Sequence, residues 1–566
     1  MPAELPKTQS APPFNAALVF ANALALHQAG RLAEAETLYR QILAVRPDDF
    51  DCLHFLGVIA HQRGNHAEAV RQIDIALLRH PDDAFALNNR GNALLALKRY
   101  DEALESYDRA LAQKPDYDDA LCNRGAALHE LRRYEEALAD CDRAIAMRPD
   151  HEEAHSNRGN TLKELRRFDE ALASCDRALA LRADFPAAHC NRANALHSLD
   201  RFEEALAGYR QAIALQPHYP EALTNRGVTL HDLRRFDEAL ASYRQALAVE
   251  PDYAEAHFRE AMWRLLTGDL ARGWAKQEWR WKSRQLAGAG RNFRQPLWLG
   301  TDEIAGKTIL IHAEQGFGDT IQFCRYLPHV AERAERVILE IPDPLQELMA
   351  TLPGGAQIVS RGTLPDFDLH CPLLSLPLAF GTELATTPSA TPYLRAQADQ
   401  VGRWSDRLGA KTRPRIGLVW SGNAAHKNDH RRSIGLASFL SILDGIGATF
   451  VSLQRDVRAD DAAVLRHRGD IVHFGAELKT FSDTAALIMN LDLVISVDTA
   501  VAHLAGALAK PVWVLLPFIP DWRWLLDRDD SPWYPTARLF RQDATRTWGG
   551  TLARVRAALD RHFGNA

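Results

Sequence analysis

Residues 84–117 read AFALNNRGNALLALKRYDEALESYDRALAQKPDY, and residues 118–151 read DDALCNRGAALHELRRYEEALADCDRAIAMRPDH. The two stretches agree at NRG, at EAL and at a proline near the end, so the chain repeats itself every 34 residues. Prolines stand on this grid at Pro47, Pro81, Pro115, Pro149, Pro217 and Pro251, with Ala183 in the remaining position. An alanine column runs through Ala35, Ala69, Ala103, Ala137, Ala171, Ala205 and Ala239. A period of this length predicts a solenoid of stacked supersecondary units.

The composition of each repeat predicts a pair of helices. Small residues let the two helices approach closely, and proline ends the second helix because it has no amide hydrogen to donate. An aromatic column, which we expect to fill the gap to the next pair, reads Tyr39, Tyr107, Tyr209 and Tyr243. This pattern resembles the tetratricopeptide repeat (TPR), with seven copies at 16–253 after a disordered stretch at 1–15. Residues 254–287, with Trp263, Trp274, Trp279 and Trp281, predict a degenerate capping repeat that joins the α-solenoid to the next domain.

An asparagine column lies on the first helix of the repeats, the face that lines the concave groove of such solenoids. Its members are Asn89, Asn123, Asn157, Asn191 and Asn225. An amide side chain offers both donors and an acceptor, so a column of them can hold a peptide backbone without reading its sequence. The arrangement resembles the asparagine ladder of protein O-GlcNAc transferases. The alternative is that the amides serve only hydrogen bonds between repeats.

Beyond residue 287 the period disappears and short apolar runs alternate with helical stretches. The runs are 308–312, 337–341, 416–420, 450–453, 493–497 and 512–516. This alternation predicts parallel α/β sheets, and a polar stretch at 397–414 divides the runs into two groups. We expect two Rossmann-like subdomains, at 288–405 and 406–566, that form a crevice between the carboxyl ends of their strands, as in the GT-B fold.

Three loops that follow predicted strands carry phosphate-binding chemistry. Glu314-Gln315-Gly316-Phe317-Gly318-Asp319 precedes a helix expected near Thr320, and its glycines allow close backbone approach to an anion. The dinucleotide-binding pattern lacks its third glycine here, which argues against a nicotinamide enzyme. The second loop, 421–433, contains Lys427, Arg431 and Arg432, which suit a diphosphate unless they are simply a solvated charge run.

The third loop reads Asp498-Thr499-Ala500-Val501-Ala502-His503. We expect Asp498 to cap the following helix, with Thr499 and His503 on one face beside free backbone amides that would hold phosphate oxygens. The alternative is an ordinary capped helix with a buried histidine.

Together the segments GFGD, GLVWSGN…HKND..RRS and SVDTAVAHLAGALAKPVW resemble the heptosyltransferase superfamily, glycosyltransferase family 9, over about residues 306–520. The resemblance implies that Asp319 is the catalytic base. It implies that Lys427, with Arg431 or Arg432, binds the phosphates of the donor, and that Asp498, Thr499 and His503 belong to the same phosphate site. Repeats followed by such a domain resemble bacterial protein O-glycosyltransferases, including those that modify flagellin.

The expected activity is therefore inverting transfer of a sugar from a nucleotide-sugar donor to Ser or Thr hydroxyls of a polypeptide recruited by the groove, with no metal and no further cofactor. Transfer to a lipid-linked or polysaccharide acceptor is one alternative, and a non-catalytic TPR scaffold with a relic transferase domain is another. The motif Asp366-Phe367-Asp368 imitates a metal-binding sequence of another transferase fold, and we interpret its two carboxylates as ordinary surface residues of a turn.

Composition narrows the partners and the compartment. A net charge of −6 argues against a nucleic-acid binder. The first fifteen residues lack the basic and apolar regions of a signal peptide, and no apolar run is long enough for a membrane span. Seven scattered cysteines do not form a disulfide framework. We expect a cytoplasmic protein without an integral membrane segment.

Overall fold

The computed structural model describes residues 14–284, 286, 290–426 and 428–563. The chain divides into two compact units, residues 1–229 and 230–566. The expected disorder at 1–15 falls almost wholly outside the described residues. No helix in the described ranges is long and apolar enough to cross a membrane.

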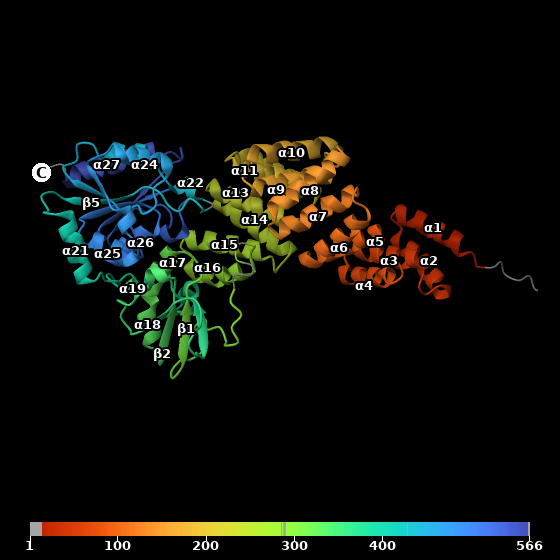
Figure 1. Cartoon of the computed structure of the whole chain (residues 1–566), viewed down its shortest axis with the longest axis horizontal. Helices are drawn as coiled ribbons and strands as arrows, with labels where there is room; N and C mark the ends of the chain where they lie inside the picture. Colours follow the sequence, from red (N-terminus) through yellow and green to blue (C-terminus); the bar gives the residue numbers. More distant parts are fainter. Residues whose placement is uncertain (1–13, 285, 287–289, 427, 564–566) are drawn as a thin grey trace, which may run out of the picture. The chain divides into compact units, whose positions relative to one another are not determined.

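The first unit consists of helices that pair in sequence order, each packed on the next (Figure 1). They are α1 (Ala16–Gln28), α2 (Leu32–Val45), α3 (Phe50–Gln62), α4 (His66–Leu77), α5 (Ala84–Ala96), α6 (Tyr100–Gln113), α7 (Asp118–Glu130), α8 (Tyr134–Met147), α9 (Glu152–Glu164), α10 (Phe168–Leu181), α11 (Pro186–Ser198) and α12 (Phe202–Leu215). Helix α13 (Pro220–Asp232) begins in this unit and ends in the second. The predicted solenoid of helix pairs is confirmed.

The spacing of small and large residues, which recurs from repeat to repeat, determines the contact inside each helix pair. A Cβ atom on Gly91 would lie 2.4 Å from the Tyr107 ring, so the glycine makes room for the aromatic residue of its own pair. The Tyr107 hydroxyl donates to Asn92 at 2.7 Å. The ring also joins Ala127 of the next pair in one apolar cluster. Tyr107 therefore packs against the next pair, as expected, and also fills the space beside Gly91 within its own pair.

The second unit opens with helices that complete the repeat region. These are α14 (Phe236–Val249), α15 (Ala254–Leu266) and α16 (Leu270–Gln277). Trp274 is fully buried, donates its indole N–H to the Thr382 carbonyl at 2.9 Å, and packs edge-on against Trp522 and Phe323. Thr382 and Trp522 lie in the α/β part of the unit, so this tryptophan fixes α16 to the sheets.

The α/β part contains parallel strands in two sheets of the described chain. The first sheet has the order β3-β2-β1-β4, and the second has the order β10-β9-β8-β5-β6-β7. The strands are β1 (Thr308–His312), β2 (Arg336–Glu340), β3 (Gln357–Val359), β4 (Leu369–Pro372), β5 (Arg415–Val419), β6 (Thr449–Ser452), β7 (Ile471–His473), β8 (Leu493–Val497), β9 (Val512–Leu516) and β10 (Ala537–Arg541). This architecture confirms the predicted fold class, a TPR solenoid followed by GT-B-like α/β subdomains.

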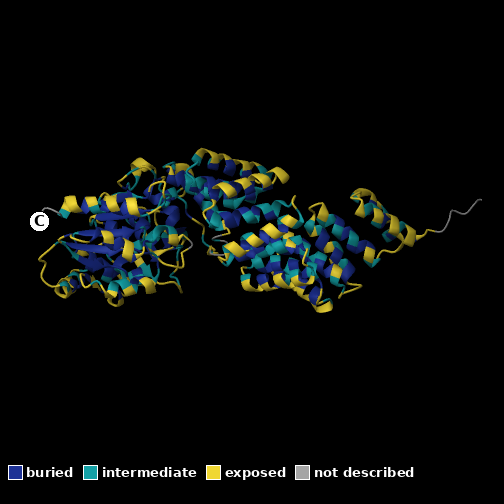
Figure 2. Ribbon diagram, turned by 90° about the horizontal axis from the view of Figure 1, so that it is seen from above, coloured by how far each residue is buried: buried dark blue, intermediate teal, exposed yellow. Residues whose placement is uncertain are grey.

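Helices cover these sheets, and the strands are the most buried part of the unit (Figure 2). The helices are α17 (Phe317–Phe323), α18 (Leu327–Ala331), α19 (Gln346–Met349), α20 (Leu376–Ala379), α21 (Ala398–Leu408), α22 (Asp429–Arg432), α23 (Leu436–Phe439), α24 (Ala459–Arg466), α25 (Phe481–Met489), α26 (Ala500–Ala507) and α27 (Gly549–Phe563). The polar stretch at 397–414 contains α21, whose Trp404 packs edge-on against Phe474. An amphipathic helix therefore stands where composition alone suggested a linker.

Candidate functional site

The strand order of both sheets points to the same loops. In the second sheet β5 lies between β8 and β6, so the chain leaves β5 and β8 in opposite lateral directions. In the first sheet β1 lies between β2 and β4. Ligands of open α/β sheets bind outside the carboxyl ends of strands at such switch points. The three predicted loops follow β1, β5 and β8.

The glycine loop after β1 turns directly into α17. Gly316 is the N-cap, and its amide donates to the Asp319 carboxylate at 2.8 Å. The helix starts at Phe317, earlier than the expected Thr320, because this carboxylate satisfies the free amide at the helix start. Gly318 and Asp319 therefore lie in the first turn of the helix and not in the loop before it.

Gly318 brings the first loop against the third. A Cβ atom on Gly318 would lie 3.1 Å from His503 Cδ2 and 3.5 Å from Ala500 Cα, and both of these residues belong to α26. The first distance is shorter than an ordinary van der Waals contact, so a larger side chain would require His503 or its surroundings to shift by a few tenths of an ångström. The glycine is needed for the approach of α17 to α26, and two of the predicted loops are in contact.

Asp319 is mostly buried, with 19% of its side chain exposed, and is paired with Arg523. The same guanidinium donates to Asp521 at 2.8 Å. Burial raises the pKa of Asp319, Arg523 opposes that rise, and the neighbouring Asp521 adds to it. A carboxylate in this setting is a stronger base than one exposed to water.

The third loop differs from its prediction at the helix cap. Thr499, not Asp498, is the N-cap of α26, and its hydroxyl lies 3.1 Å from the Ser496 hydroxyl. Asp498 lies between the last residue of β8 and this N-cap. Burial and the nearby Asp521 raise the pKa of Asp498 to about 6, against the effects of Trp524, Arg432 and Arg523. Three carboxylates, of Asp319, Asp498 and Asp521, thus share the positive charge of Arg523.

His503 is buried beneath aromatic residues. Its Nδ1 lies 3.0 Å from the Tyr534 hydroxyl, and its ring stacks on Trp524 at a centroid distance of 5.2 Å. Burial lowers the pKa of His503 well below its usual value, so the ring is neutral at physiological pH. A neutral imidazole can offer its remaining nitrogen to a ligand but not a positive charge.

The second loop is organised around a buried carboxylate, Asp429. It accepts from the Ser433 hydroxyl at 2.9 Å and pairs with Arg458 and Arg432. Arg432 also donates to the Asp498 carbonyl at 3.1 Å, which joins the second loop to the third. Lys427, the other cation expected to bind phosphate, lies outside the described residues.

Arg431 points to a different partner. Its guanidinium donates to the Asp232 carboxylate at 2.8 Å, at the end of α13. The Asp232 carbonyl accepts from Arg546, and Arg234 donates to Asp527 at 2.6 Å. The structure therefore brings Arg432 to the other predicted residues, while Arg431 is engaged by the end of the repeat region.

Sequence reasoning missed Arg523 and a second buried ion pair beside the glycine loop. Glu314 accepts two hydrogen bonds of 3.0 Å from Arg280, which also binds Glu278 and the Ser375 hydroxyl. Burial raises the pKa of Glu314 to about 7 although Arg280 lowers it. Arg523 stands in Trp522-Arg523-Trp524, a segment that reads as apolar core. An arginine between two tryptophans was the available signal.

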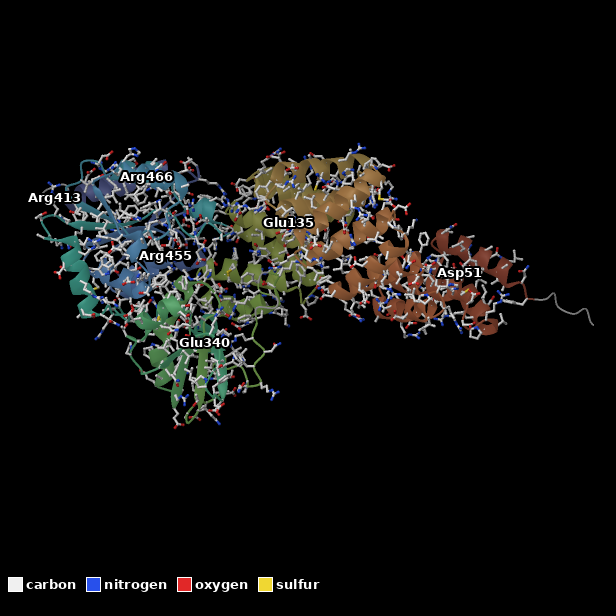
Figure 3. The ribbon with its side chains drawn as sticks, viewed as in Figure 1. Asp51, Glu135, Glu340, Arg413, Arg455 and Arg466 are labelled. Carbon is white, nitrogen blue, oxygen red and sulfur yellow. The ribbon has the colours of Figure 1, made fainter. Side chains whose placement is uncertain are left out.

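Other charged side chains follow strands at the carboxyl edges of the sheets. Figure 3 labels Glu340 at the end of β2 and Arg455 just beyond β6. Glu340 is fully buried and pairs with Arg291. His312, at the end of β1, lies 3.3 Å from His370. Glu340 and His312 give the first sheet a polar carboxyl edge, and Arg455 lies at the corresponding edge of the second.

The asparagine column makes hydrogen bonds between repeats. The bonds join Asn89 to His54 (2.9 Å), Asn123 to Asn88 (3.0 Å), Asn157 to the Cys122 sulfur (3.3 Å), Asn191 to the Ser156 hydroxyl (3.1 Å) and Asn225 to Asn194 (3.0 Å). All five side chains are half-buried. Each amide nitrogen thus contacts the preceding repeat, which favours the alternative that the column serves hydrogen bonds between repeats. Peptide binding by the amide oxygens stays a prediction.

One group in the first unit has the composition of a metal site. Ligand atoms of Asp118, Asp119 and His151 lie within 4.8 Å of one another. Arg148, however, pairs with Asp118 at 2.8 Å and with Asp119 at 2.6 Å. The guanidinium already supplies the positive charge that these carboxylates need.

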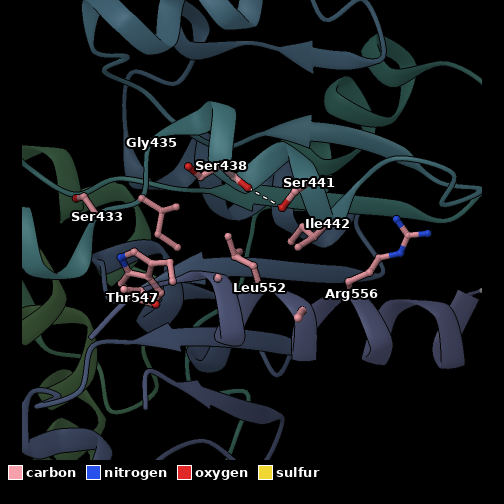
Figure 4. A pocket seen from close by; sticks show the side chains of 12 residues that line it. Ser433, Gly435, Ser438, Ser441, Ile442, Thr547, Leu552 and Arg556 are labelled. Atoms are coloured by element: carbon pink, nitrogen blue, oxygen red, sulfur yellow. Dashed lines mark hydrogen bonds between the residues drawn. The ribbon is translucent and has the colours of Figure 1, made fainter. Parts of the chain in front are cut away.

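A cavity of about 690 Å³ adjoins the end of the second loop at Ser433 and lies between residues 433–442 and the first half of α27 (Figure 4). Ser438 and Ser441 line one side, Leu552 and Arg556 the other. The Arg556 guanidinium is held by Asp560 at 3.0 Å. None of the residues predicted to bind the donor is among the residues that line it.

Comparison with known proteins agrees with this division of the chain. Residues 475–515 match glycosyltransferase family 9 (heptosyltransferase), a segment that includes β8 and the third loop. Tetratricopeptide-repeat families match residues 20–84, 56–118, 88–152, 152–185, 193–234 and 220–253. The prediction of N-terminal TPRs followed by a family 9 region is confirmed at this level.

Among curated proteins, the chain is 26% identical over 330 residues to Protein FlbA of Caulobacter vibrioides, which covers 53% of this chain and 54% of that protein. The chain thus spans about half the length of this curated relative. Among solved structures, a tetratricopeptide repeat protein from Parabacteroides merdae has 19% identity and a TM-score of 0.36, covering 42% of this chain and 93% of the other. A thermophilic TPR protein of Thermus thermophilus has 27% identity and a TM-score of 0.30, covering 32% and 99%.

Proposed function

We propose that the protein is a glycosyltransferase that moves a sugar from a nucleotide-sugar donor to a hydroxyl group of a polypeptide. One observation carries the proposal: the loops after β1, β5 and β8 meet through Gly318 against His503 and through Arg432 on the Asp498 carbonyl. The last of these loops lies inside the segment that matches family 9. Residues far apart in sequence thus form one polar cluster at the switch points of both sheets.

The chemistry follows from the charges in that cluster. Asp319 accepts the proton of the acceptor hydroxyl as its oxygen attacks the anomeric carbon, and the configuration at that carbon inverts. Arg432, Lys427 and the amides at the start of α26 offset the negative charge that grows on the departing nucleotide phosphate. His503 offers a neutral hydrogen-bonding nitrogen to the same phosphates. Asp498 helps to hold Arg523 and shapes the start of α26. This scheme needs no metal ion.

The acceptor is a polypeptide bound by the repeats, with Ser or Thr hydroxyls as the reacting groups and flagellin as one candidate. The support is the array of matched TPRs, since such repeats are protein-binding modules. The finer identity of donor sugar and nucleotide is left to experiment.

A two-step experiment tests the proposal. A thermal-shift screen of the purified full chain against UDP, GDP, ADP and CMP sugars identifies the donor, because a bound ligand raises the unfolding midpoint. Co-expression with acceptor candidates, followed by mass spectrometry, should then show a sugar adduct on Ser or Thr. Asp319→Asn should abolish the adduct while the donor-induced thermal shift remains. A protein that neither binds nor turns over any nucleotide sugar is not a glycosyltransferase.

The role of the repeats needs its own variant. Deleting residues 16–219 removes the first compact unit up to the start of α13 and keeps Asp232 in its helix, where it contacts Arg431. The shortened protein should keep donor binding and lose transfer to protein. Equal transfer to protein with and without these residues would exclude the groove as the acceptor site.

A further inference from the structure

Arg523 occupies a position that the three motif loops do not include. It lies beyond the end of the family 9 match at residue 515, in the connection between β9 and β10. Only 9% of its side chain is exposed. One terminal nitrogen donates to Asp319, and the other donates to Asp521 at 2.8 Å. The guanidinium thus joins a residue of the second α/β subdomain to the proposed base on the first.

The surroundings of Arg523 restrict its motion. Its guanidinium lies 4.3 Å from the Trp522 ring centroid and 5.7 Å from that of Phe323. The Asp521 carboxylate accepts from the Arg523 backbone amide at 3.0 Å as well as from its side chain. Arginine presents its donors in a fixed planar fork, so a guanidinium held at one end orients the carboxylate at the other.

Building on the proposed function, we propose that Arg523 is the positioning residue of the base: it orients the Asp319 carboxylate for proton acceptance and keeps it ionised. The Gly316 amide binds Asp319 Oδ2 and Arg523 binds Oδ1. With both oxygens held, the plane of the carboxylate is fixed. A base that accepts the proton of one bound hydroxyl requires such a fixed orientation.

The charge balance shows why a cation is needed at this point. Asp521 faces Asp319 from the Arg523 segment, and Glu314 faces it from its own loop. Asp498 lies close to Asp521 and to Arg523. The charges of Asp319 and Asp521 also act to raise the pKa of His426 in the second loop. His503 from α26 is neutral. Acidic groups therefore surround the base, and within the described residues Arg523 is the cation that forms an ion pair with it.

Removing that cation has a predictable effect on pH dependence. An opposite charge at this distance lowers the pKa of an aspartate by about 1–3 units. In Arg523→Gln, the pKa of Asp319 should rise, because burial and Asp521 then act without opposition. The acidic limb of the pH–rate profile should move to higher pH by about one unit or more. In Arg523→Lys the limb should lie between those of the wild type and the glutamine variant, because charge is retained without the planar fork.

The experiment measures donor turnover by the full-length protein from pH 5 to pH 9 for the wild type, both Arg523 variants and a matched control. The control is Arg528→Gln, which changes an arginine of the same segment that pairs with Asp530 at 2.6 Å and contacts none of the three loops through that pair. The control should keep the wild-type profile. Lower activity in Arg523→Gln with an unshifted acidic limb would overturn the proposal. A general loss of folded protein would lower the maximal rate of the pH–rate profile and leave the position of its acidic limb unchanged.

A second readout does not depend on turnover. In Arg523→Gln the ionised Asp319 is buried without its partner, so this variant should lose thermal stability as the pH rises through the elevated pKa of Asp319. Adding Asp319→Asn should restore part of that loss at pH 8 and little at pH 5. If the wild type turns over no nucleotide sugar, the proposed function fails, while this rescue still decides whether Arg523 serves Asp319. Absence of rescue overturns the inference in either case.

Discussion

Replacing Gly318 with alanine tests the contact between the first and third loops. The new Cβ would lie 3.1 Å from His503 Cδ2, and His503 has little freedom to move because Tyr534 and Trp524 hold its ring. Gly402 in α21 provides a matched control, since no described atom outside its own helix lies within 4 Å of a Cβ placed there.

The magnitude follows from the difference between the two sites. Glycine to alanine in a helix stabilises the fold by about 0.5–1 kcal/mol, and this gain should be similar at both positions. Overpacking costs about 1–3 kcal/mol, and only Gly318→Ala suffers it. Gly318→Ala should therefore be less stable than Gly402→Ala by about 1–3 kcal/mol.

Differential scanning calorimetry of both variants measures this difference, and donor binding by thermal shift measures the functional effect. We expect Gly402→Ala to bind the donor like the wild type and Gly318→Ala to bind it at least tenfold more weakly, because α17 and α26 are pushed apart. Equal stabilisation of both variants, with unchanged donor binding, would refute the contact between the loops and with it the basis of the proposed site.

Three further perturbations test other parts of the site. Asp319→Asn should reduce the rate of transfer by about 10²–10⁴-fold with little change in donor affinity, as expected for loss of a general base, and a KM-against-kcat comparison would expose a purely binding role. Asp498→Asn should raise the unfolding midpoint above pH 6 but not at pH 4, because the pKa of Asp498 is raised to about 6 in the folded protein, so the cost of burying its charge grows as the pH rises toward that value and is complete above it; an equal change at both pH values would contradict the assignment. Asp232→Ala should release Arg431 and lower stability by about 1 kcal/mol. A double-mutant cycle with Arg431→Gln measures this pair, and additive effects would mean that the two side chains do not interact.

The repeats could be predicted because each of them contains the residues that determine its own helix pair. Glycine, alanine and proline at fixed spacing specify a helix pair from local sequence alone. The same local logic predicted β8 and β9 to the residue, because strands buried on both faces read as continuous apolar runs. β3 has only three residues and is partly exposed, and the sequence of β10 is interrupted by two arginines. Neither strand therefore gives a continuous apolar run.

The site could be predicted in outline and not in its pairings. Glycines, clustered cations or an aspartate directly after a predicted strand indicate a candidate anion site, so the three loops were recognisable. The Arg523 contact with Asp319 joins residues 204 positions apart, and the Arg431 contact with Asp232 joins residues 199 apart. Such pairs depend on how the sheets and the last helices pack, and no local pattern encodes them.

The course of α13 bears on how this protein can be recombined with others. The helix starts in one compact unit, and its last residue, Asp232, belongs to the other and holds an arginine beside the donor loops. A chimaera that exchanges the repeat array at the end of the seventh motif would discard that carboxylate together with the native repeats that it replaces. A junction placed before Pro220 would exchange the first compact unit and keep Asp232 in its own helix beside Arg431.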